Sequence, residues 1–368
     1  MKRFTCFTFS KADRTIRFKT ILLMLCVLSL PVQAIAVRLP EVKVSNVRRV
    51  FHNGEHNAFT DMIRFKNKLF LTFRSCPDGH MVHPTASIII LSSDDAKQWK
   101  QIHHFCISKR DTRDPHLLVF KDKLFVYTGT WYSGETSPKP EDYDLNKHLG
   151  YAACSEDGKK WQSPIMLEGT FGHYIWRAST FGGKAYLCGR RKIEFADEPR
   201  GEGSMVESAM LESQDGLIWH TRALFQEVRG DETAFQFEAD GSVIAIARRG
   251  IDRDESQLLT SKPPYTQWER KDLDRCVGGP LLARWGGRFV VGGRKTTADT
   301  GAKTSLCWLV NDKLHEFAEL PSGGDNSYPG LVEISPNHAI ISWYSSHEKD
   351  ENGKTITAIY MADLKIVE

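Results

Sequence analysis

One apolar strand pattern recurs six times along this chain, and it limits the possible folds more than any other feature. Each copy is an apolar run that follows a tight polar turn, and successive copies start 46 to 61 residues apart. The runs begin at Lys68, Lys123, Lys184, Ser242, Arg288 and His338. Every turn contains Gly, Asn or Asp, which tolerate the positive φ that a hairpin needs. Six hairpins at this spacing predict an all-β, six-bladed β-propeller, because a four-stranded blade buries both faces only against neighbouring blades.

A second repeat, of the form Ser-x-Asp-(Gly/Ala)-x-x-Trp, lies between the hairpins. Its three copies span residues 93–99, 155–161 and 213–219. An Asp side chain that accepts hydrogen bonds from nearby backbone N–H groups, closed by a packed Trp, ties two outer strands together. Three copies in register with the hairpin repeat support the propeller prediction.

The N-terminus has the order of a secretory signal peptide. The first 19 residues contain six basic side chains, residues 21–30 are apolar apart from Ser29, and small residues follow at Ala34 and Ala36. This order predicts a signal peptide over residues 1–34, followed by a single propeller domain over residues 35–368. About ten apolar residues are too few to span a bilayer, so we expect a secreted or periplasmic protein without stable membrane insertion after cleavage.

Charge and cysteine content exclude some partners. Removal of residues 1–34 takes away six basic groups and one acidic group, so the formal charge changes from +3 to −2. No clustered basic motif remains, and we expect no nucleic-acid partner. The six later cysteines include no C-x-x-C pair, so they do not indicate zinc. Export would permit one or two disulfides, and otherwise these cysteines are small buried hydrophobic residues. They are Cys76, Cys106, Cys154, Cys188, Cys276 and Cys307.

Arginines end several of the apolar runs, where polar side chains of a propeller face a shared central pocket. Guanidinium groups around one axis repel each other unless they meet carboxylates or an anionic ligand. They indicate either a site for a carboxylate- or sulfate-bearing substrate or a set of structural ion pairs between blades. The arginines are Arg74, Arg190, Arg191, Arg248, Arg249 and Arg294.

Carboxylates and one tyrosine accompany these arginines. Converging carboxylates carry out glycoside hydrolysis, in which one group protonates the leaving oxygen and another acts as nucleophile or base. A Tyr beside a Glu base can serve as a neutral nucleophile when the reacting carbon already carries a carboxylate. Each of these side chains could instead have a structural role. The candidates are Asp61, Asp78, Asp114, Glu207, Glu232 and Tyr328.

Three pairs of histidines are close in sequence. Their spacings, on expected strands and loops, do not define a ligand set, and we expect no metal and no cofactor. The pairs are His52 and His56, His80 and His83, and His103 and His104.

Over roughly residues 50–365 the chain resembles the sialidase superfamily of six-bladed propellers with Asp-box (BNR) repeats. LFLTFRS, a loop and then SIIILSSDDAKQW are similar to the family's first blade, which implies that Arg74 is a substrate-binding arginine and Asp78 the catalytic acid. GDETAFQFEADGSVIAIAR resembles the segment that carries the catalytic glutamate, here Glu232, and a carboxylate-binding arginine, here Arg248.

The later blades continue the resemblance. Arg294 falls where another arginine of the triad is expected, and NSYPGLVEISPNHAIISWY is similar to the last blade with its tyrosine, here Tyr328. One position departs from the family pattern. Sialidases open with an arginine followed by Ile-Pro, whereas this chain has Asn57 at the place of that arginine.

Residues and resemblance together predict an exported glycoside hydrolase that acts on an anionic sugar of the sialic-acid, uronic or sulfated type. The catalytic candidates are Tyr328, Glu232 and Asp78. The substrate-binding candidates are Arg74, Arg190, Arg248, Arg294 and Asp114.

Two alternatives remain open at this point. The chain is also similar to five-bladed arabinosidase-like enzymes, which implies Asp61 as base, Asp114 as modulator and Glu207 as acid. A non-catalytic propeller that binds glycans would show the same repeats, because a fold does not fix a function.

Overall fold

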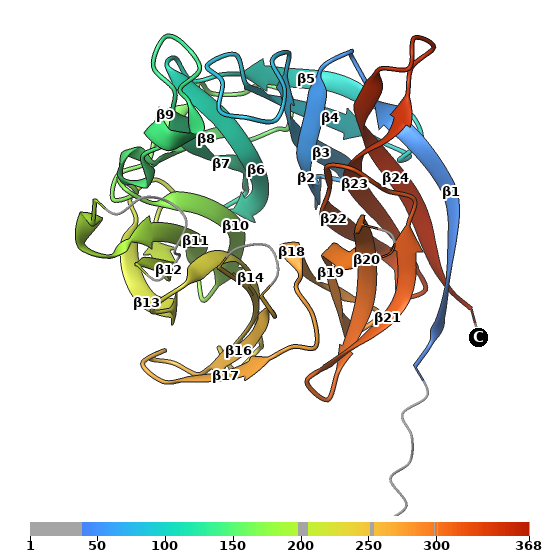
Figure 1. Cartoon of the computed structure of the whole chain (residues 1–368). Helices are drawn as coiled ribbons and strands as arrows, with labels where there is room; N and C mark the ends of the chain where they lie inside the picture. The colour runs from blue at the N-terminus through green and yellow to red at the C-terminus, as the bar shows by residue number, and fades with distance from the viewer. Residues whose placement is uncertain (1–38, 198–204, 251–253, 298, 300, 368) are drawn as a thin grey trace, which may run out of the picture. The chain divides into compact units, whose positions relative to one another are not determined.

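The described residues fold into six four-stranded antiparallel sheets, which are arranged as blades around a central axis (Figure 1). This computed structural model describes residues 39–197, 205–250, 254–297, 299 and 301–367. The predicted all-β, six-bladed propeller is confirmed, and the five-bladed alternative is wrong in its blade count. The predicted signal peptide, residues 1–34, lies outside the described residues.

Blades 1 to 3 follow chain order from the axis outward. Blade 1 contains β2 (His56–Phe65), β3 (Lys68–Cys76), β4 (Ser87–Ser93) and β5 (Lys100–Phe105). Blade 2 contains β6 (Arg110–Phe120), β7 (Lys123–Tyr132), β8 (Leu149–Ser155) and β9 (Ile165–Met166). Blade 3 contains β10 (Tyr174–Phe181), β11 (Lys184–Lys192), β12 (Val206–Ser213) and β13 (His220–Gln226). Three short 3₁₀ turns lie in the loops: η1 (Pro140–Asp142), η2 (Leu145–Lys147) and η3 (Ile193–Phe195).

Blades 4 and 5 repeat the same order. Blade 4 contains β14 (Gly230–Phe237), β15 (Val243–Arg249), β16 (Gln257–Ser261) and β17 (Trp268–Asp272). Blade 5 contains β18 (Gly278–Trp285), β19 (Arg288–Thr297), β20 (Gly301–Val310) and β21 (Lys313–Leu320). The six predicted apolar runs are the second strands of the blades, and only β15 begins one residue later than predicted.

Blade 6 closes the ring by joining both ends of the propeller. It contains β22 (Asn326–Ser335), β23 (His338–Lys349), β24 (Thr355–Val367) and, as its outer strand, β1 (Glu41–Phe51). The register of β1 against β24 runs from Glu41 opposite Val367 to Phe51 opposite Ile359. This pairing ties the first described strand to the last.

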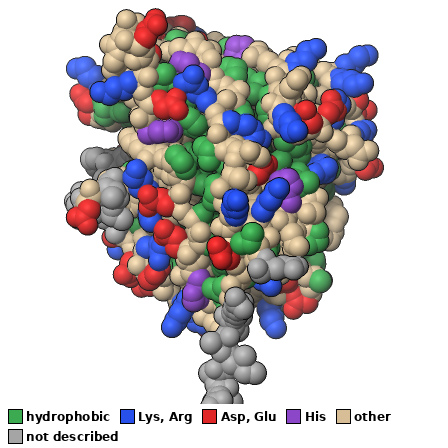
Figure 2. Space-filling model, turned by 90° about the vertical axis from the view of Figure 1, so that its right-hand side faces the viewer, with side chains coloured by type: hydrophobic (Ala, Val, Ile, Leu, Met, Phe, Trp, Pro, Cys, Tyr) green, Lys and Arg blue, Asp and Glu red, His purple; other side chains and the backbone are tan. Residues whose placement is uncertain are grey.

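On the face shown in Figure 2, basic and acidic side chains are interspersed.

The three predicted Ser-x-Asp turns form between the third and fourth strands of blades 1 to 3. In the first, Asp95 Oδ1 accepts hydrogen bonds from the backbone N–H groups of Lys97 and Gln98 at 2.8 and 2.9 Å. These N–H groups lower the pKa of Asp95, because they favour the ionised carboxylate. The other two turns, at Asp157 and Asp215, have the same bonds.

Each inner strand has a register shift against its second strand. The shifts lie at Ala58/Asp61, Arg113/His116, Trp176/Ala178, Gly230/Thr233, Gly278/Leu281 and Ser327/Gly330. A β-bulge bends a strand and redirects a side chain. At three of the shifts a non-glycine residue has positive φ: Phe59 (63°), Asp114 (49°) and Tyr328 (49°). The six bulges therefore place redirected side chains in a ring around the axis.

A buried ion pair joins the inner strands across the axis. Arg177 of β10 donates to Asp61 Oδ1 in β2 at 2.9 Å, and it also donates to the carbonyl oxygens of Pro329 at 2.8 Å and Pro280 at 3.2 Å. Asp61 Oδ2 accepts from the backbone N–H of Leu117 in β6 at 2.9 Å. The pair thus links five blades, and it uses the carboxylate of Asp61 that the arabinosidase-like alternative assigned as base.

Aromatic side chains fill the spaces between blades. The largest fully buried ones are Trp176, Trp285, Trp308 and Trp343. Cys76, Cys154, Cys188 and Cys307 are buried thiols within this packing. Within the described residues, no helix is long and apolar enough to cross a membrane.

We expect Arg177→Met to lower the free energy of unfolding by about 3–5 kcal/mol, because it leaves the buried carboxylate of Asp61 without its cation. Urea denaturation of both proteins measures the difference. Arg49→Met is the matched control, since the Arg49–Glu348 pair at 2.7 Å is exposed and such pairs contribute about 0–1 kcal/mol. Equal losses in the two variants would contradict a special role for the buried pair.

Candidate active site

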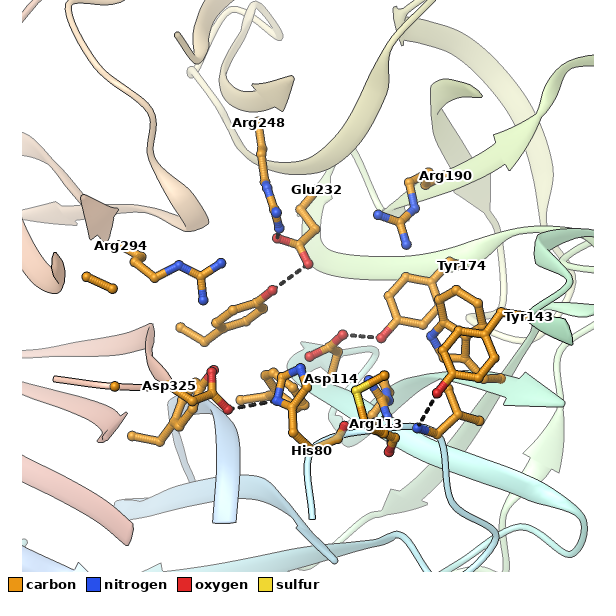
Figure 3. A pocket seen from close by; sticks show the side chains of 18 of the residues that line it. His80, Arg113, Asp114, Tyr143, Tyr174, Arg190, Glu232, Arg248, Arg294 and Asp325 are labelled. Carbon is orange, nitrogen blue, oxygen red and sulfur yellow. Dashed lines mark hydrogen bonds and ion pairs between the residues drawn. The ribbon is translucent and has the colours of Figure 1, made fainter. Parts of the chain in front are cut away.

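A cavity of about 520 Å³ lies where the bulges of the inner strands meet the ends of the second strands (Figure 3). Four arginines reach it from four successive blades: Arg113, Arg190, Arg248 and Arg294. Three carboxylates line it as well: Asp114, Glu232 and Asp325. Aromatic rings complete much of the wall: Phe59, Trp131, Tyr143, Tyr174, Tyr328 and Tyr344. A polar, aromatic-walled cavity of this size suits a sugar.

Tyr328 and Glu232 meet directly in the cavity although 96 residues separate them. The Tyr328 hydroxyl donates to Glu232 Oε1 at 2.7 Å, and Arg248 Nη1 donates to Glu232 Oε2 at 3.0 Å. Burial, together with the negative charges of Glu232 and Asp114, raises the pKa of Tyr328 well above its usual range. The arrangement therefore pairs a neutral phenol with a carboxylate that can take its proton.

A glycine in the neighbouring blade makes room for the Tyr328 ring. Gly279 has a φ of 59°, and a Cβ atom there would lie 2.5 Å from a carbon of that ring. Tyr328 itself lies in a bulge with positive φ. Strained backbone of this kind costs about 1–3 kcal/mol and concentrates at functional sites.

Asp114 forms a second carboxylate–tyrosine pair. Its Oδ2 accepts a short hydrogen bond from the Tyr174 hydroxyl, whereas Oδ1 is buried and has no hydrogen-bond partner among the described residues. Burial, followed by the negative charge of Glu232, raises the pKa of Asp114 to about 7. Asp114 is therefore a carboxyl group that can carry a proton near neutral pH.

Buried carboxylates hold the cavity arginines in place. Asp231 pairs with Arg190 through a short contact and lies 3.6 Å from Arg248. Asp111 holds Arg113 with two bonds of 2.9 and 2.6 Å. These pairs fix the orientations of the guanidinium groups before any ligand arrives.

The fourth cavity arginine, Arg294, reaches the backbone of blade 6. Its Nη1 donates to the carbonyl oxygen of Asn326 at 3.5 Å. The side chain comes from β19 and points into the cavity in the view of Figure 3.

Of the eight site residues expected from sequence, the cavity brings together six: Tyr328, Glu232, Asp114, Arg190, Arg248 and Arg294.

The other two expected site residues, Arg74 and Asp78, do not line the cavity. Arg74 is fully buried, where it donates two bonds to Asp111, at 3.1 and 2.8 Å, and further bonds to the carbonyl oxygens of Gly79 and Met81. Its guanidinium therefore anchors the loop after β3. Asp78 is on the exposed side of that loop and accepts from the Thr85 hydroxyl at 2.5 Å.

Two further positions from the sequence analysis have structural partners. Asn57 is buried, and its amide donates to Asn53 Oδ1 and to the carbonyl oxygens of Glu55 and Thr357. Glu207 pairs with Arg191 outside the cavity lining. Asp61, Asp114 and Glu207 therefore do not share one site.

Sequence reasoning missed one cluster at the cavity wall. Asp325 Oδ2 lies 2.8 Å from His56 Nε2 and 2.7 Å from His80 Nδ1, and the Tyr344 hydroxyl donates to Asp325 Oδ1 at 2.7 Å. Burial opposes ionisation of Asp325, but the bonds from the two histidines outweigh it and hold its pKa below the usual range. The histidine spacing gave no signal, because Asp325 is 245 residues after His80.

No sequence-family model matches this chain, and no curated protein sequence is significantly similar to it. Solved structures do match. A protein of unknown function from Dyadobacter fermentans aligns with a TM-score of 0.71 at 19% identity, over 89% of this chain and 100% of that one. An α-L-arabinofuranosidase mutant from Fusarium graminearum, in complex with an iminosugar inhibitor, aligns with a TM-score of 0.58 at 14% identity, over 89% and 98%.

A sialidase has the same fold. The Trypanosoma rangeli sialidase in complex with sialic acid aligns with a TM-score of 0.60 at 11% identity. The match covers 89% of this chain but only 59% of the sialidase, so this chain spans about three fifths of its length. At these identities the likeness shows the shared fold alone.

We expect Glu232→Gln to lower the pKa of Asp114, because the substitution removes the neighbouring negative charge that helps to raise it. A carbon-13 NMR titration of the Asp carboxyl groups measures the change. Glu207→Gln is the control, since Glu207 is outside the cavity. An Asp114 pKa that does not respond to Glu232→Gln would show that the two carboxyl groups are not electrostatically linked.

Proposed function

We propose that this protein is a retaining glycoside hydrolase that acts on an anionic sugar. The observation that carries the proposal is the 2.7 Å hydrogen bond from the Tyr328 hydroxyl to Glu232, in the same cavity as the protonatable Asp114. A nucleophile joined to its base, with a separate acid nearby, is the set of groups that glycosyl transfer to water requires.

In the first step, Tyr328 Oη attacks the anomeric carbon and its proton passes to Glu232 Oε1. The glycosidic bond breaks as Asp114 gives its proton to the leaving oxygen. A tyrosine is a suitable nucleophile here because a neutral hydroxyl is not repelled by an acidic group on the sugar. The products of this step are a glycosyl–Tyr328 intermediate and the released alcohol.

In the second step, water attacks the anomeric carbon and its proton passes to the Asp114 carboxylate. The Tyr328 oxygen leaves and recovers its proton from Glu232. Two displacements at one carbon give net retention of configuration. Each group returns to its starting protonation state.

The arginines support the choice of an anionic sugar. Arg190, Arg248 and Arg294 reach one cavity, and buried carboxylates or backbone oxygens hold them from behind. Guanidinium groups that line a cavity bind carboxylates, sulfates and phosphates.

The structural neighbours are compatible with this proposal. One Trypanosoma rangeli sialidase structure contains 2,3-difluorosialic acid as a covalent intermediate, and the arabinofuranosidase contains an iminosugar. Export through the predicted signal peptide would bring the enzyme to extracellular or periplasmic glycans and belongs to the same proposal.

We expect the protein spanning residues 35–368 to release the aglycone from a fluorogenic sialoside, uronide or sulfated glycoside. Tyr328→Phe and Glu232→Gln should abolish this activity, because they remove the nucleophile and its base. Asp78→Asn is the matched control and should retain activity, since Asp78 is exposed and outside the cavity. If neither acidic nor neutral glycosides were hydrolysed while glycan binding remained, the result would favour a non-catalytic glycan-binding propeller instead.

We expect turnover to fall as the pH rises through the pKa of Asp114, near 7, because only the protonated carboxyl can assist the leaving oxygen. Asp114→Asn should lower the rate about 10²- to 10⁴-fold for natural linkages. The loss should be much smaller for aryl glycosides with acidic leaving groups, which depart without protonation. Equal losses for both leaving groups would show that Asp114 does not act as the acid.

We expect Arg294→Met to weaken binding of an acidic-sugar inhibitor by roughly 1.5–3 kcal/mol, the range for a hydrogen bond to a charged group. Binding of the matched neutral inhibitor, in which an amide replaces the carboxylate, should change less. Isothermal titration calorimetry of both inhibitors measures the difference. An equal loss for the two inhibitors would contradict recognition of charge by Arg294.

A further inference from the structure

Two histidines and one aspartate converge at the cavity wall formed by blades 1 and 6. His56 lies in β2, His80 in the loop after β3, and Asp325 immediately before β22. One ligand atom from each lies within 4.8 Å of the other two. His80 and Asp325 both line the cavity, and Figure 3 shows their hydrogen bond at its edge.

We propose that His56, His80 and Asp325 bind a divalent transition-metal ion of the Zn²⁺ class. Two imidazole nitrogens and one carboxylate oxygen are ligands that Zn²⁺ prefers, and three protein ligands leave one coordination position open. The side chains become more exposed from His56 (11%) to Asp325 (27%) to His80 (46%). Because His80 and Asp325 line the cavity, a ligand in the cavity would have access to the ion.

The two separations that involve Asp325 are already close to those that the ion requires. Bonds of about 2.0–2.1 Å to a tetrahedral ion place neighbouring ligand atoms roughly 3.3 Å apart. The present contacts of 2.8 and 2.7 Å must therefore lengthen by about half an ångström. His80 is on an exposed loop, which allows its ring to make this movement.

Coordination also requires a lone pair on each nitrogen that faces Asp325. The N–H hydrogen of a neutral ring then moves to its other nitrogen, and a charged ring releases a proton to solvent. His56 Nδ1 has no hydrogen-bond partner in the part of the chain that the structure describes. Apart from Asp325, no described group fixes the tautomer of that ring.

Tyr344 supplies the outer contact that metal ligands usually have. Its hydroxyl donates to Asp325 Oδ1 at 2.7 Å, which turns Oδ2 toward the two histidines. Partners of this kind orient a ligand, and their loss weakens metal affinity about 10- to 100-fold.

The ion would complete the ring of positive charge around the cavity. Among the described residues, the lining arginines come from blades 2 to 5, whereas blades 1 and 6 contribute the metal-ligand cluster. A metal ion there would offer a coordination position to an oxygen of a bound ligand on the side without an arginine. Metal binding itself does not depend on the proposed hydrolase activity. The proposal departs from the sequence analysis, which expected no metal because the histidine spacings do not define a ligand set.

The test uses protein without a polyhistidine tag, freed of metal by dialysis against a chelator and then titrated calorimetrically with Zn²⁺. We expect one zinc ion per chain, which remains bound after desalting. His80→Ala and Asp325→Asn should reduce bound zinc to background, and Tyr344→Phe should weaken binding about 10- to 100-fold. Circular dichroism checks that each variant is folded.

His83→Ala is the matched control. His83 is on the same loop, but its Nδ1 faces the Ser137 hydroxyl rather than the cluster, so we expect this variant to keep one zinc ion per chain. Absence of stoichiometric zinc binding by the unmodified protein would overturn the proposal. Binding that survives both His80→Ala and Asp325→Asn would overturn it as well.

Discussion

The buried pair of Arg177 and Asp61 is the interaction on which the cavity depends most. Neighbouring blades contact each other around the ring, but this pair also connects strands on opposite sides of the axis. All three guanidinium nitrogens of Arg177 donate hydrogen bonds. Asp61 accepts hydrogen bonds from Arg177, from the backbone N–H of Leu117 in β6 and from the backbone N–H of Met62 in its own strand. A buried ion pair contributes mainly by its geometry, because its desolvation cost offsets much of its attraction. Here it fixes the relative positions of five of the six inner strands, which carry several of the cavity residues.

All six inner strands contain a β-bulge, but the bulges present different side chains. They present an aromatic ring at Phe59, a carboxyl group at Asp114 and a phenol at Tyr328. The fifth bulge contains Gly279, which leaves space for the Tyr328 ring. A repeat architecture thus supplies a bulge to each inner strand, and divergence of single residues turns the bulges into a site.

The hairpin repeat made the fold predictable, since turn chemistry and apolar alternation are local properties. Glu232 and Tyr328 were predictable because their surrounding segments resemble a known family. Contacts between side chains of different blades were not predictable. Arg74 was therefore expected to bind substrate, although its guanidinium pairs with Asp111. Asp114 was predicted as a substrate-binding residue, but its raised pKa was not, because that depends on burial and on Glu232 from another blade. His56 and His80 gained significance only when folding brought Asp325 beside them.

One electrostatic constraint supports the proposed acid and base. Glu232 and Asp114 line the same cavity, where burial and the charge of Glu232 raise the pKa of Asp114. Two ionised carboxylates at this separation repel strongly, so a neutral proton-bearing form is favoured for one of them. Arg248 pairs directly with Glu232, whereas among the described residues the Tyr174 hydroxyl is the one hydrogen-bond donor to the Asp114 carboxyl group. In the proposed mechanism Glu232 accepts the Tyr328 proton, and Asp114, whose pKa is raised to about 7 by burial and by Glu232, gives a proton to the leaving oxygen.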